Sequence, residues 1–418
     1  MLNCSYPAHG GNGLVNRVVP EVEREALKKS CVNKTYQISD ADLSVFYRFA
    51  DGVLSPLQGP MCAGEFNRVL DEEVIIRGGK KYAWTIPLSF PASRAEASSF
   101  RAGETVAVEN SKGEFIGTLT IEEIYSFDKD RYNKSVYGTD RTDHPGARIF
   151  NDDSRDMLLG GKIWALPQPE DKDFGQYMMS PLLVRNLIAS RGWECAVAFQ
   201  TRNALHRAHE YALIYAVETL TREGKFTGAV LNPLVGATKS DDVPAGTRMK
   251  TYETMLQTRV FGQGDLDLDL WKSKGLDFED NLVLVGMDMK MFYAGPKEAV
   301  MHAIYRQNYG FTHIVIGRKH ADAPYDDGSA IWGDFDAHHK FDHLGGELLI
   351  QPAKVGFAAF FEEINRVGLI EEFKPKGYHT VFISGKDVRA RLQSGEDVDT
   401  RIMRKCVGDV LKAFYAGA

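Results

Sequence analysis

The sequence predicts an α/β fold in three parts, because the pattern of apolar residues changes twice along the chain. Residues 1–180 hold short apolar strands separated by turn residues, without regular strand–helix alternation. Residues 181–350 alternate strands with helices, which is typical of a parallel sheet with crossover helices. Residues 351–418 differ from both, with two expected helices and a short chain length typical of a small domain. We therefore predict a β-rich N-terminal domain, a central parallel-sheet domain and a small C-terminal α/β lid over these three ranges.

The individual elements follow from the same pattern. In the N-terminal part, Gly-Gly, Pro and Asn-Ser turns separate strands expected at residues 73–76, 84–86, 105–108 and 115–121. In the central part, we expect strands at residues 196–199, 229–233, 282–285 and 313–316, and helices at 206–222, 246–261 and 296–309. In the C-terminal part, we expect helices at residues 357–367 and 407–415.

Composition excludes several classes of protein. The 418 residues are 44% hydrophobic and 26% charged, which is enough to build two or three cores. No apolar run reaches about 18 residues, and residues 1–13 lack the pattern of a secretory signal. A net charge of −7 without a long Lys/Arg run argues against a nucleic-acid partner. Five scattered cysteines without C-x-x-C spacing predict a reducing, cytoplasmic location.

The most informative segment is Phe-Gln-Thr-Arg-Asn-Ala-Leu-His-Arg-Ala-His-Glu at residues 199–210. A buried strand ends at Phe199, a polar turn at residues 200–205 follows, which we call the elbow, and a helix begins near His206. His206 and His209 then share one face of the first helical turn, where free N–H groups and the helix dipole favour a phosphate. Arg202 and Asn203 add further donors at the same place. The elbow therefore predicts an anion site, and a phosphate ester in particular.

Two other interpretations of this segment are weaker. A lone histidine on a helix is usually a surface or core residue, but so many polar donors at one strand end favour a ligand site, since ligands of open α/β sheets bind there. A zinc protease of the HExxH type is excluded, because Arg207 stands where the glutamate is needed and the histidines are three residues apart.

Four segments, in order along the chain, resemble motifs of the ATP sulfurylase family. Residues 200–209 resemble Q-x-R-N-P-x-H-x-x-H and the H-x-G-H element of wider nucleotidyltransferases. Residues 293–299, 317–321 and 383–389 resemble Y-A-G-P-R-E-A, G-R-D-H-A and I-S-G-T-x-x-R. The resemblance implies a PUA-like N-terminal domain and a central nucleotidyltransferase domain. It also implies that sulfate attacks the α-phosphate of ATP in line and reversibly, giving adenosine 5′-phosphosulfate and pyrophosphate.

The resemblance also assigns roles to residues. Gln200, Arg202 and the backbone N–H of Ala321 would bind sulfate. The implied catalytic residues are Thr201, Arg202, Asn203, His206 and His209. The implied nucleotide-binding residues are Gln200, Asn203, His206, His209, Gly317, Arg318, Lys319, His320 and Val355. Mg²⁺ would accompany ATP or pyrophosphate, and the chain would form a homo-oligomer without nucleic-acid or membrane partners.

The chain departs from the family pattern at three positions. Ala204 replaces a proline, Phe292 replaces the arginine of M-R-Y-A-G-P, and Lys319 replaces the aspartate of G-R-D-H. Lys319 either binds phosphate directly or faces solvent, and the role of Phe292 stays open. Because residues 293–310 contain no cysteine, we predict no zinc on this segment, which some family members carry.

Three other features bear on activity. Residues 236–240 are too short for the phosphate-binding loop of a fused kinase, so we predict a monofunctional, prokaryotic-type enzyme. Residues 334–343 are rich in Asp and His, which are possible metal ligands. We favour a solvated polar loop over a metal site for this segment. The Asp and His residues are Asp334, Asp336, His338, His339, Asp342 and His343.

Two other functions are kept as alternatives. One is an adenylyltransferase with a different anionic acceptor, and the other is a nucleotide- or RNA-binding regulatory protein. The complete Gln200–Arg202 pair, together with Ala321, favours sulfate over the first alternative, and low basicity disfavours the second. Whether the reaction serves assimilation or respiration, and which oligomer forms, is not determined by the sequence.

Overall fold

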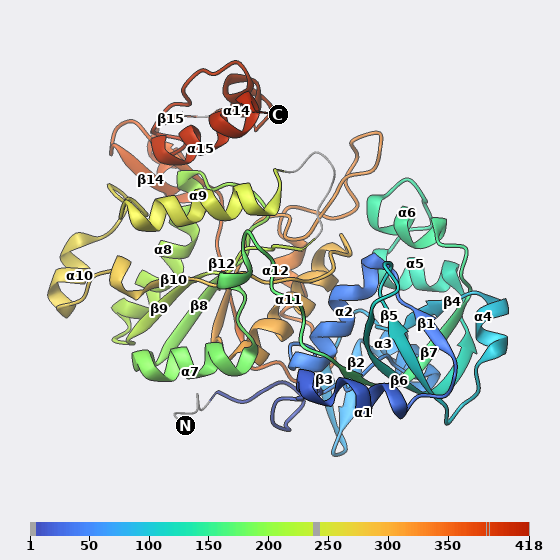
Figure 1. The fold of residues 1–418 in the computed structure, drawn as a ribbon. Helices are drawn as coiled ribbons and strands as arrows, with labels where there is room; N and C mark the ends of the chain where they lie inside the picture. Colours follow the sequence, from blue (N-terminus) through green and yellow to red (C-terminus); the bar gives the residue numbers. More distant parts are fainter. Residues whose placement is uncertain (1–5, 237–242, 382, 384, 418) are drawn as a thin grey trace.

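The computed structural model describes residues 6–236, 243–381, 383 and 385–417. Ser384 of the fourth motif, and residues 237–240 of the rejected phosphate loop, lie outside the described residues. The chain runs from an N-terminal β-rich part through a central sheet to a C-terminal part that packs on the central helices (Figure 1).

The N-terminal part is built on a five-stranded sheet with the order β1-β5-β6-β7-β4. Only β1 and β5 pair in parallel, and the other neighbours are antiparallel. The strands are β1 (Thr35–Gln37), β4 (Phe90–Ala92), β5 (Thr105–Glu109), β6 (Phe115–Ser126) and β7 (Met157–Ala165), with a separate hairpin of β2 (Val74–Arg77) and β3 (Lys80–Ala83). The helices are α1 (Arg24–Lys29), α2 (Asp40–Asp51), α3 (Ala63–Glu72), α4 (Arg94–Ser99), α5 (Lys129–Tyr137) and α6 (Pro145–Asp152), with the 3₁₀ turn η1 (Glu21–Glu23).

One expected N-terminal strand is wrong. Residues 84–86 lie outside any strand, and the partner of β2 is β3, four residues earlier. Trp84 is fully buried and its indole N–H donates to the carbonyl of Ile86, 2.9 Å away. The apolar run therefore marks a buried, side-chain-anchored connection, which periodicity alone does not distinguish from a short strand. The other three expected strands correspond to β2, β5 and β6.

The central part is a parallel sheet with the order β10-β9-β8-β11-β12. Its strands are β8 (Cys195–Phe199), β9 (Thr227–Leu231), β10 (Leu282–Leu284), β11 (His313–Ile316) and β12 (Gln351–Lys354). The helices are α7 (Pro181–Arg191), α8 (Arg207–Arg222), α9 (Ala245–Gln257), α10 (Leu268–Lys274), α11 (Gly295–Tyr309) and α12 (Asp336–Lys340), with the 3₁₀ turns η2 (Gly175–Tyr177) and η3 (Glu279–Asn281). The expected alternation is confirmed, and β12 is an additional edge strand.

The C-terminal part corrects another expectation. Residues 357–367 are not helical but form an antiparallel hairpin, with Ala358 paired to Leu369 and Phe360 to Val367. Asn365 adopts the left-handed φ of +50° that the turn requires. The elements are β13 (Ala358–Phe361), β14 (Arg366–Leu369), α13 (Ile370–Phe373), η4 (Lys374–Lys376), β15 (Thr380–Val381), α14 (Gly385–Gln393) and α15 (Lys405–Ala416). The expected final helix is α15.

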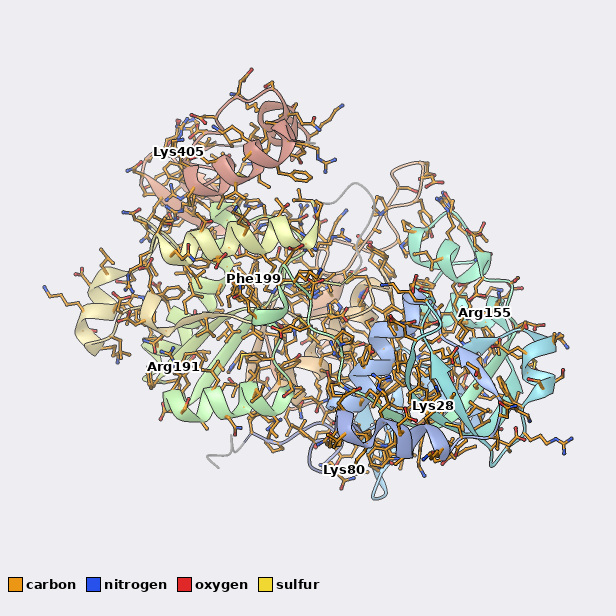
Figure 2. The ribbon with its side chains drawn as sticks, viewed as in Figure 1. Lys28, Lys80, Arg155, Arg191, Phe199 and Lys405 are labelled. Atoms are coloured by element: carbon orange, nitrogen blue, oxygen red, sulfur yellow. The ribbon has the colours of Figure 1, made fainter. Side chains whose placement is uncertain are left out.

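The two faces of the central sheet belong to different cores. Along β8, Ala196 and Ala198 pack with the N-terminal part and α11, while Val197 and Phe199 pack with α8, α9 and the C-terminal part. This follows from the two-residue period of a strand. Phe199, the last residue of β8, lies near the middle of the molecule (Figure 2). Within the described ranges, no helix is long and apolar enough to cross a membrane.

Candidate active site

The candidate site lies where the order of successive strands in the central sheet reverses. From β8 the chain proceeds through β9 to β10 on one side, whereas β11 lies on the other side of β8. β8 and β11 pair directly, with Val197 opposite His313 and Ala198 opposite Ile314. Their carboxyl ends therefore open side by side, at the switch point where open parallel sheets bind ligands. The structure brings the elbow and the loop at residues 317–321 together at this point.

Hydrogen bonds fix the elbow's backbone. Asn203 donates its N–H to the buried Thr201 hydroxyl, 3.1 Å away, and its carbonyl accepts the Tyr252 hydroxyl from α9 at 2.7 Å. The N–H of Leu234, after β9, donates to the Thr201 carbonyl at 2.9 Å. Thr201 is thus an anchor of the elbow, and Asn203 keeps its side chain exposed.

Three buried polar atoms of the elbow and helix have no hydrogen-bond partner in the described part of the chain. They are Gln200 Oε1, Arg202 Nη1 and His209 Nδ1. A buried polar group without a partner costs about 1–3 kcal/mol, so its persistence needs an explanation. Because an amide can be turned to present its NH₂ group in place of its oxygen, Gln200 can act as a donor here. Open donors beside the end of a parallel strand suit an anionic ligand.

The two histidines stack on each other at the start of α8. Their ring centroids are 3.7 Å apart, with 22° between the planes, and His206 is the N-cap residue. Burial lowers the pKa of His206 to about 4. Burial, together with His206, holds the pKa of His209 well below its ordinary value. At neutral pH both rings are uncharged, and each offers one N–H donor.

Arg202 is held against the segment that resembles Y-A-G-P. Its guanidinium lies 5.3 Å from the ring centroid of Tyr293, whose φ is +57°. The fully buried Glu298 accepts the N–H groups of Phe292 at 2.8 Å and Ala294 at 3.0 Å. Burial raises the pKa of Glu298 to about 7, against the opposing effects of these hydrogen bonds and of Arg202. Tyr293 and Glu298 belong to the segment that resembles Y-A-G-P-R-E-A, but the sequence alone predicted no role for either residue.

The loop after β11 supplies the other wall. Lys319 and Ala321 have φ values of +50° and +56°, so the backbone turns sharply. The Ala321 carbonyl accepts the Gly295 N–H at 3.2 Å, while the Ala321 N–H has no acceptor among the residues that the structure describes. Val355, directly after β12, is buried and donates its N–H to the Ile316 carbonyl.

The two cations of this loop lie toward solvent. The Arg318 guanidinium is 4.3 Å from the ring centroid of Phe357, and its Nη1 is 3.7 Å from Asp334. The Lys319 ammonium is 3.8 Å from the same carboxylate, with 40% of its side chain exposed.

A chain of buried side chains runs behind the loop. His320 Nε2 and His302 Nδ1 are 3.0 Å apart, and His302 Nε2 lies 3.3 Å from Glu298. Burial holds the pKa of both histidines well below the ordinary value, and the nearby Arg306 acts in the same direction. Arg306 is fully buried and donates to Asn232 at 2.8 Å. No sequence motif predicted a role for His302 or Arg306, which lie a few residues after the segment at 293–299.

The Asp/His-rich residues 334–343 are partly helical, which corrects the expected solvated loop. Residues 336–340 form α12, and the buried His338 contacts the Ile316 carbonyl at 2.7 Å. Asp342 pairs with Lys354 at 2.6 Å. Within the described residues, no group of three or more His, Cys, Asp or Glu side chains is placed to hold a metal ion.

The fold and the site together define a class of protein. A parallel sheet with an arginine, two neutral histidines and an open backbone N–H at its switch point is typical of α/β proteins that bind nucleotides and anions there. The sequence model of the ATP-sulfurylase family matches residues 175–414, and that of a PUA-like domain matches residues 6–168. The chain belongs to the ATP-sulfurylase family.

Individual relatives agree. The chain is 50% identical over 421 aligned positions to a sulfate adenylyltransferase of Pyropia yezoensis, covering 100% of this chain and 98% of the relative. It is 33% identical to a sulfate adenylyltransferase of Halothermothrix orenii, covering 96% and 97%. Among solved structures, a hexameric APS kinase from Thiobacillus denitrificans superposes with a TM-score of 0.69 at 19% identity, covering 98% of this chain and 68% of that one. The last likeness concerns the fold alone.

Proposed function

We propose that this protein is a sulfate adenylyltransferase, which converts ATP and sulfate reversibly to adenosine 5′-phosphosulfate and pyrophosphate. The observation that carries the proposal is that three buried polar atoms without partners, on Gln200, Arg202 and His209, follow β8 at the sheet's switch point. The names of the relatives point to the same reaction.

The proposed reaction needs positioning rather than a nucleophilic side chain. Sulfate is already ionised, so a sulfate oxygen attacks the α-phosphorus directly while pyrophosphate leaves on the opposite side. Gln200, Arg202 and the Ala321 N–H would hold sulfate in line. The protein's contribution is to place two repelling anions in contact and to offset the charge that builds up in the transition state.

The remaining site residues are proposed for the nucleotide. His206 and His209 would donate to the phosphates and stabilise the leaving pyrophosphate, and Asn203 would orient the α-phosphate. Residues 317–320 and Val355 would line the nucleotide. Mg²⁺ would enter as the complex of ATP or pyrophosphate, held by phosphate oxygens and water, as is usual for this ion.

The location and assembly of the chain are proposed separately. The resemblance supports a homo-oligomer, which light scattering on the purified protein measures. The described cysteines, Cys31, Cys62, Cys195 and Cys406, are all unbridged, which supports a reducing, cytoplasmic compartment.

Pyrophosphate release tests the function. With MgATP we expect release to depend on sulfate, and to be continuous with molybdate, whose mixed anhydride is unstable. No release without an oxyanion is expected. Release that requires a carboxylate or phosphate instead of sulfate would identify a different adenylyltransferase, and nucleotide binding without any release would indicate a regulatory protein.

The neutral histidines predict that pyrophosphate binding takes up a proton. A bound polyanion favours imidazolium, so it raises the pKa of His206 from about 4 in the free protein. Between that value and the ligand-bound pKa, binding therefore carries a proton into the site. Titration calorimetry at about pH 5.5 in buffers of different ionisation enthalpy should show this uptake, which should vanish at about pH 8.

Two variants test whether the proton is taken up by His206. His206→Asn should reduce the proton uptake, whereas His343→Asn, at an exposed histidine of the same part of the chain, should leave it unchanged. Uptake of the same size in His206→Asn would mean that this ring does not contact the phosphates.

A further inference from the structure

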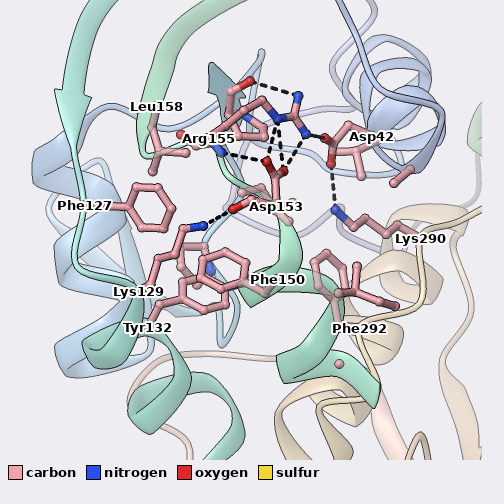
Figure 3. Close-up of a pocket in the computed structure, with 18 of the residues that line it drawn as sticks. Asp42, Phe127, Lys129, Tyr132, Phe150, Asp153, Arg155, Leu158, Lys290 and Phe292 are labelled. Carbon is pink, nitrogen blue, oxygen red and sulfur yellow. Dashed lines mark hydrogen bonds and ion pairs between the residues drawn. The ribbon is translucent and has the colours of Figure 1, made fainter. Parts of the chain in front are cut away.

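A cavity of about 110 Å³ lies between the N-terminal part and the segment that precedes Tyr293 (Figure 3). Six aromatic side chains line it: Phe66, Phe127, Tyr132, Tyr137, Phe150 and Phe292. Tyr132 and Phe150 are stacked, with ring centroids 3.9 Å apart. The cavity's volume is below the roughly 150 Å³ of an apolar cavity that binds benzene, so the cavity takes at most one small ring, with any polar group of the ligand at the opening.

The cavity's charges leave one cation without a carboxylate. Lys290 pairs with Asp42 at 2.7 Å, and Arg155 pairs with Asp153 at 2.6 Å. Lys129 instead donates to the backbone carbonyl of Asp153, and no carboxylate of the described residues lies within ion-pairing distance of its ammonium. The lining thus holds three cations and two carboxylates, which lie together beside the aromatic rings (Figure 3).

The cavity opens toward solvent beside an apolar side chain. Ile149 of α6 lines the cavity and is 56% exposed, which is unusual for an isoleucine. A ligand can therefore enter past Ile149 with its ring toward Tyr132 and its charge toward Lys129.

Phe292, whose role the sequence left open, forms the wall nearest the candidate site. It lies in the cavity lining, 8% exposed, with the Lys290 ammonium 5.4 Å from its ring centroid. The cavity thus has an aromatic ring at the position where the family pattern has an arginine. An arginine there would replace this ring with a longer, charged side chain.

We propose that this cavity binds a small aromatic monocarboxylate, with the ring between Phe127, Tyr132 and Phe292 and the carboxylate on Lys129. The net positive charge selects an anion, the volume selects one ring, and the aromatic lining supplies edge and face contacts for it. This site is separate from the candidate active site and does not depend on the proposed function.

The cavity is coupled to the elbow by two successive residues. Phe292 donates its N–H to Glu298, the backbone of Gly146 in α6 packs directly on the Phe292 carbonyl, and the next residue, Tyr293, lies under Arg202. A ligand that shifts Phe292 therefore also shifts Tyr293, whose ring contacts the Arg202 guanidinium. We infer that occupancy changes the apparent sulfate affinity, and this part alone rests on the proposed function.

Calorimetry with benzoate tests the site. We expect one benzoate per chain, and a much weaker affinity for benzamide, which has the same shape without the charge. Lys129→Gln should weaken benzoate at least about ten-fold, because a charge-assisted hydrogen bond is lost. Lys134→Gln removes an exposed ammonium on the same helix and should leave the affinity unchanged.

The position of the ligand gives a second, independent measurement. The anomalous signal of 4-iodobenzoate in a crystal of the full chain should lie among Phe127, Tyr132 and Phe292. Iodine elsewhere, equal binding by wild type and Lys129→Gln, or equal binding of benzamide would overturn the proposed site. Benzoate bound in the cavity without a change in the KM for sulfate would overturn only the coupling, and pyrophosphate release without benzoate reports the proposed function separately.

Discussion

Arg202→Lys is expected to lower the turnover of sulfate-dependent pyrophosphate release by about two orders of magnitude or more. In the structure, the guanidinium lies against Tyr293, and its Nη1 is buried without a partner. A planar fork can donate two parallel hydrogen bonds to a tetrahedral anion, which a lysine ammonium cannot reproduce. A hundred-fold loss corresponds to about 2.7 kcal/mol of transition-state stabilisation.

Steady-state kinetics with both substrates varied, alongside thermal unfolding, measures this effect. Arg222→Lys, at an exposed arginine at the far end of α8, is the matched control and should retain wild-type turnover. An unfolding midpoint like that of the wild type would show that the loss is chemical. Turnover within a few-fold of wild type would remove Arg202 from the reaction.

Asp265→Ala is expected to destabilise the chain by about 3–5 kcal/mol, the usual cost of breaking a buried ion pair. The carboxylate is fully buried, accepts Arg207 at 2.6 Å and 2.9 Å, and lies 3.4 Å from Arg404. It also accepts the N–H of Val367 in the C-terminal hairpin at 2.8 Å. Its removal leaves Arg207 as an unpaired cation in the core.

Urea unfolding of the variant and the wild type measures the loss. Asp269→Ala removes an exposed carboxylate a few residues away and should change the free energy of unfolding by less than about 0.5 kcal/mol. A similarly small change for Asp265→Ala would mean that water or rearrangement compensates Arg207. Because Arg207 follows His206 directly, loss of the pair should also disorder the start of α8.

Local patterns predicted the elements that are long or strictly periodic. The apolar spacing after His206 predicted α8, and the alternation from residue 196 onward predicted β8, β9 and β11. Residues 84–86 and 357–367 were assigned wrongly. Short apolar runs fit a strand, a buried connection and a helix equally well, and their state is decided by which neighbour they pair with.

The sequence by itself determined the family, the order of the three parts and the elbow's composition, because these are properties of successive residues. Only the tertiary structure decided that β11 lies beside β8, which puts the elbow and the loop at residues 317–321 at the same edge of the sheet. It alone placed Glu298 behind Arg202, stacked the two histidines, and lowered the pKa of His206 to about 4. The physical reason is that pairing, burial and desolvation depend on residues far apart in the chain, which local periodicity does not encode.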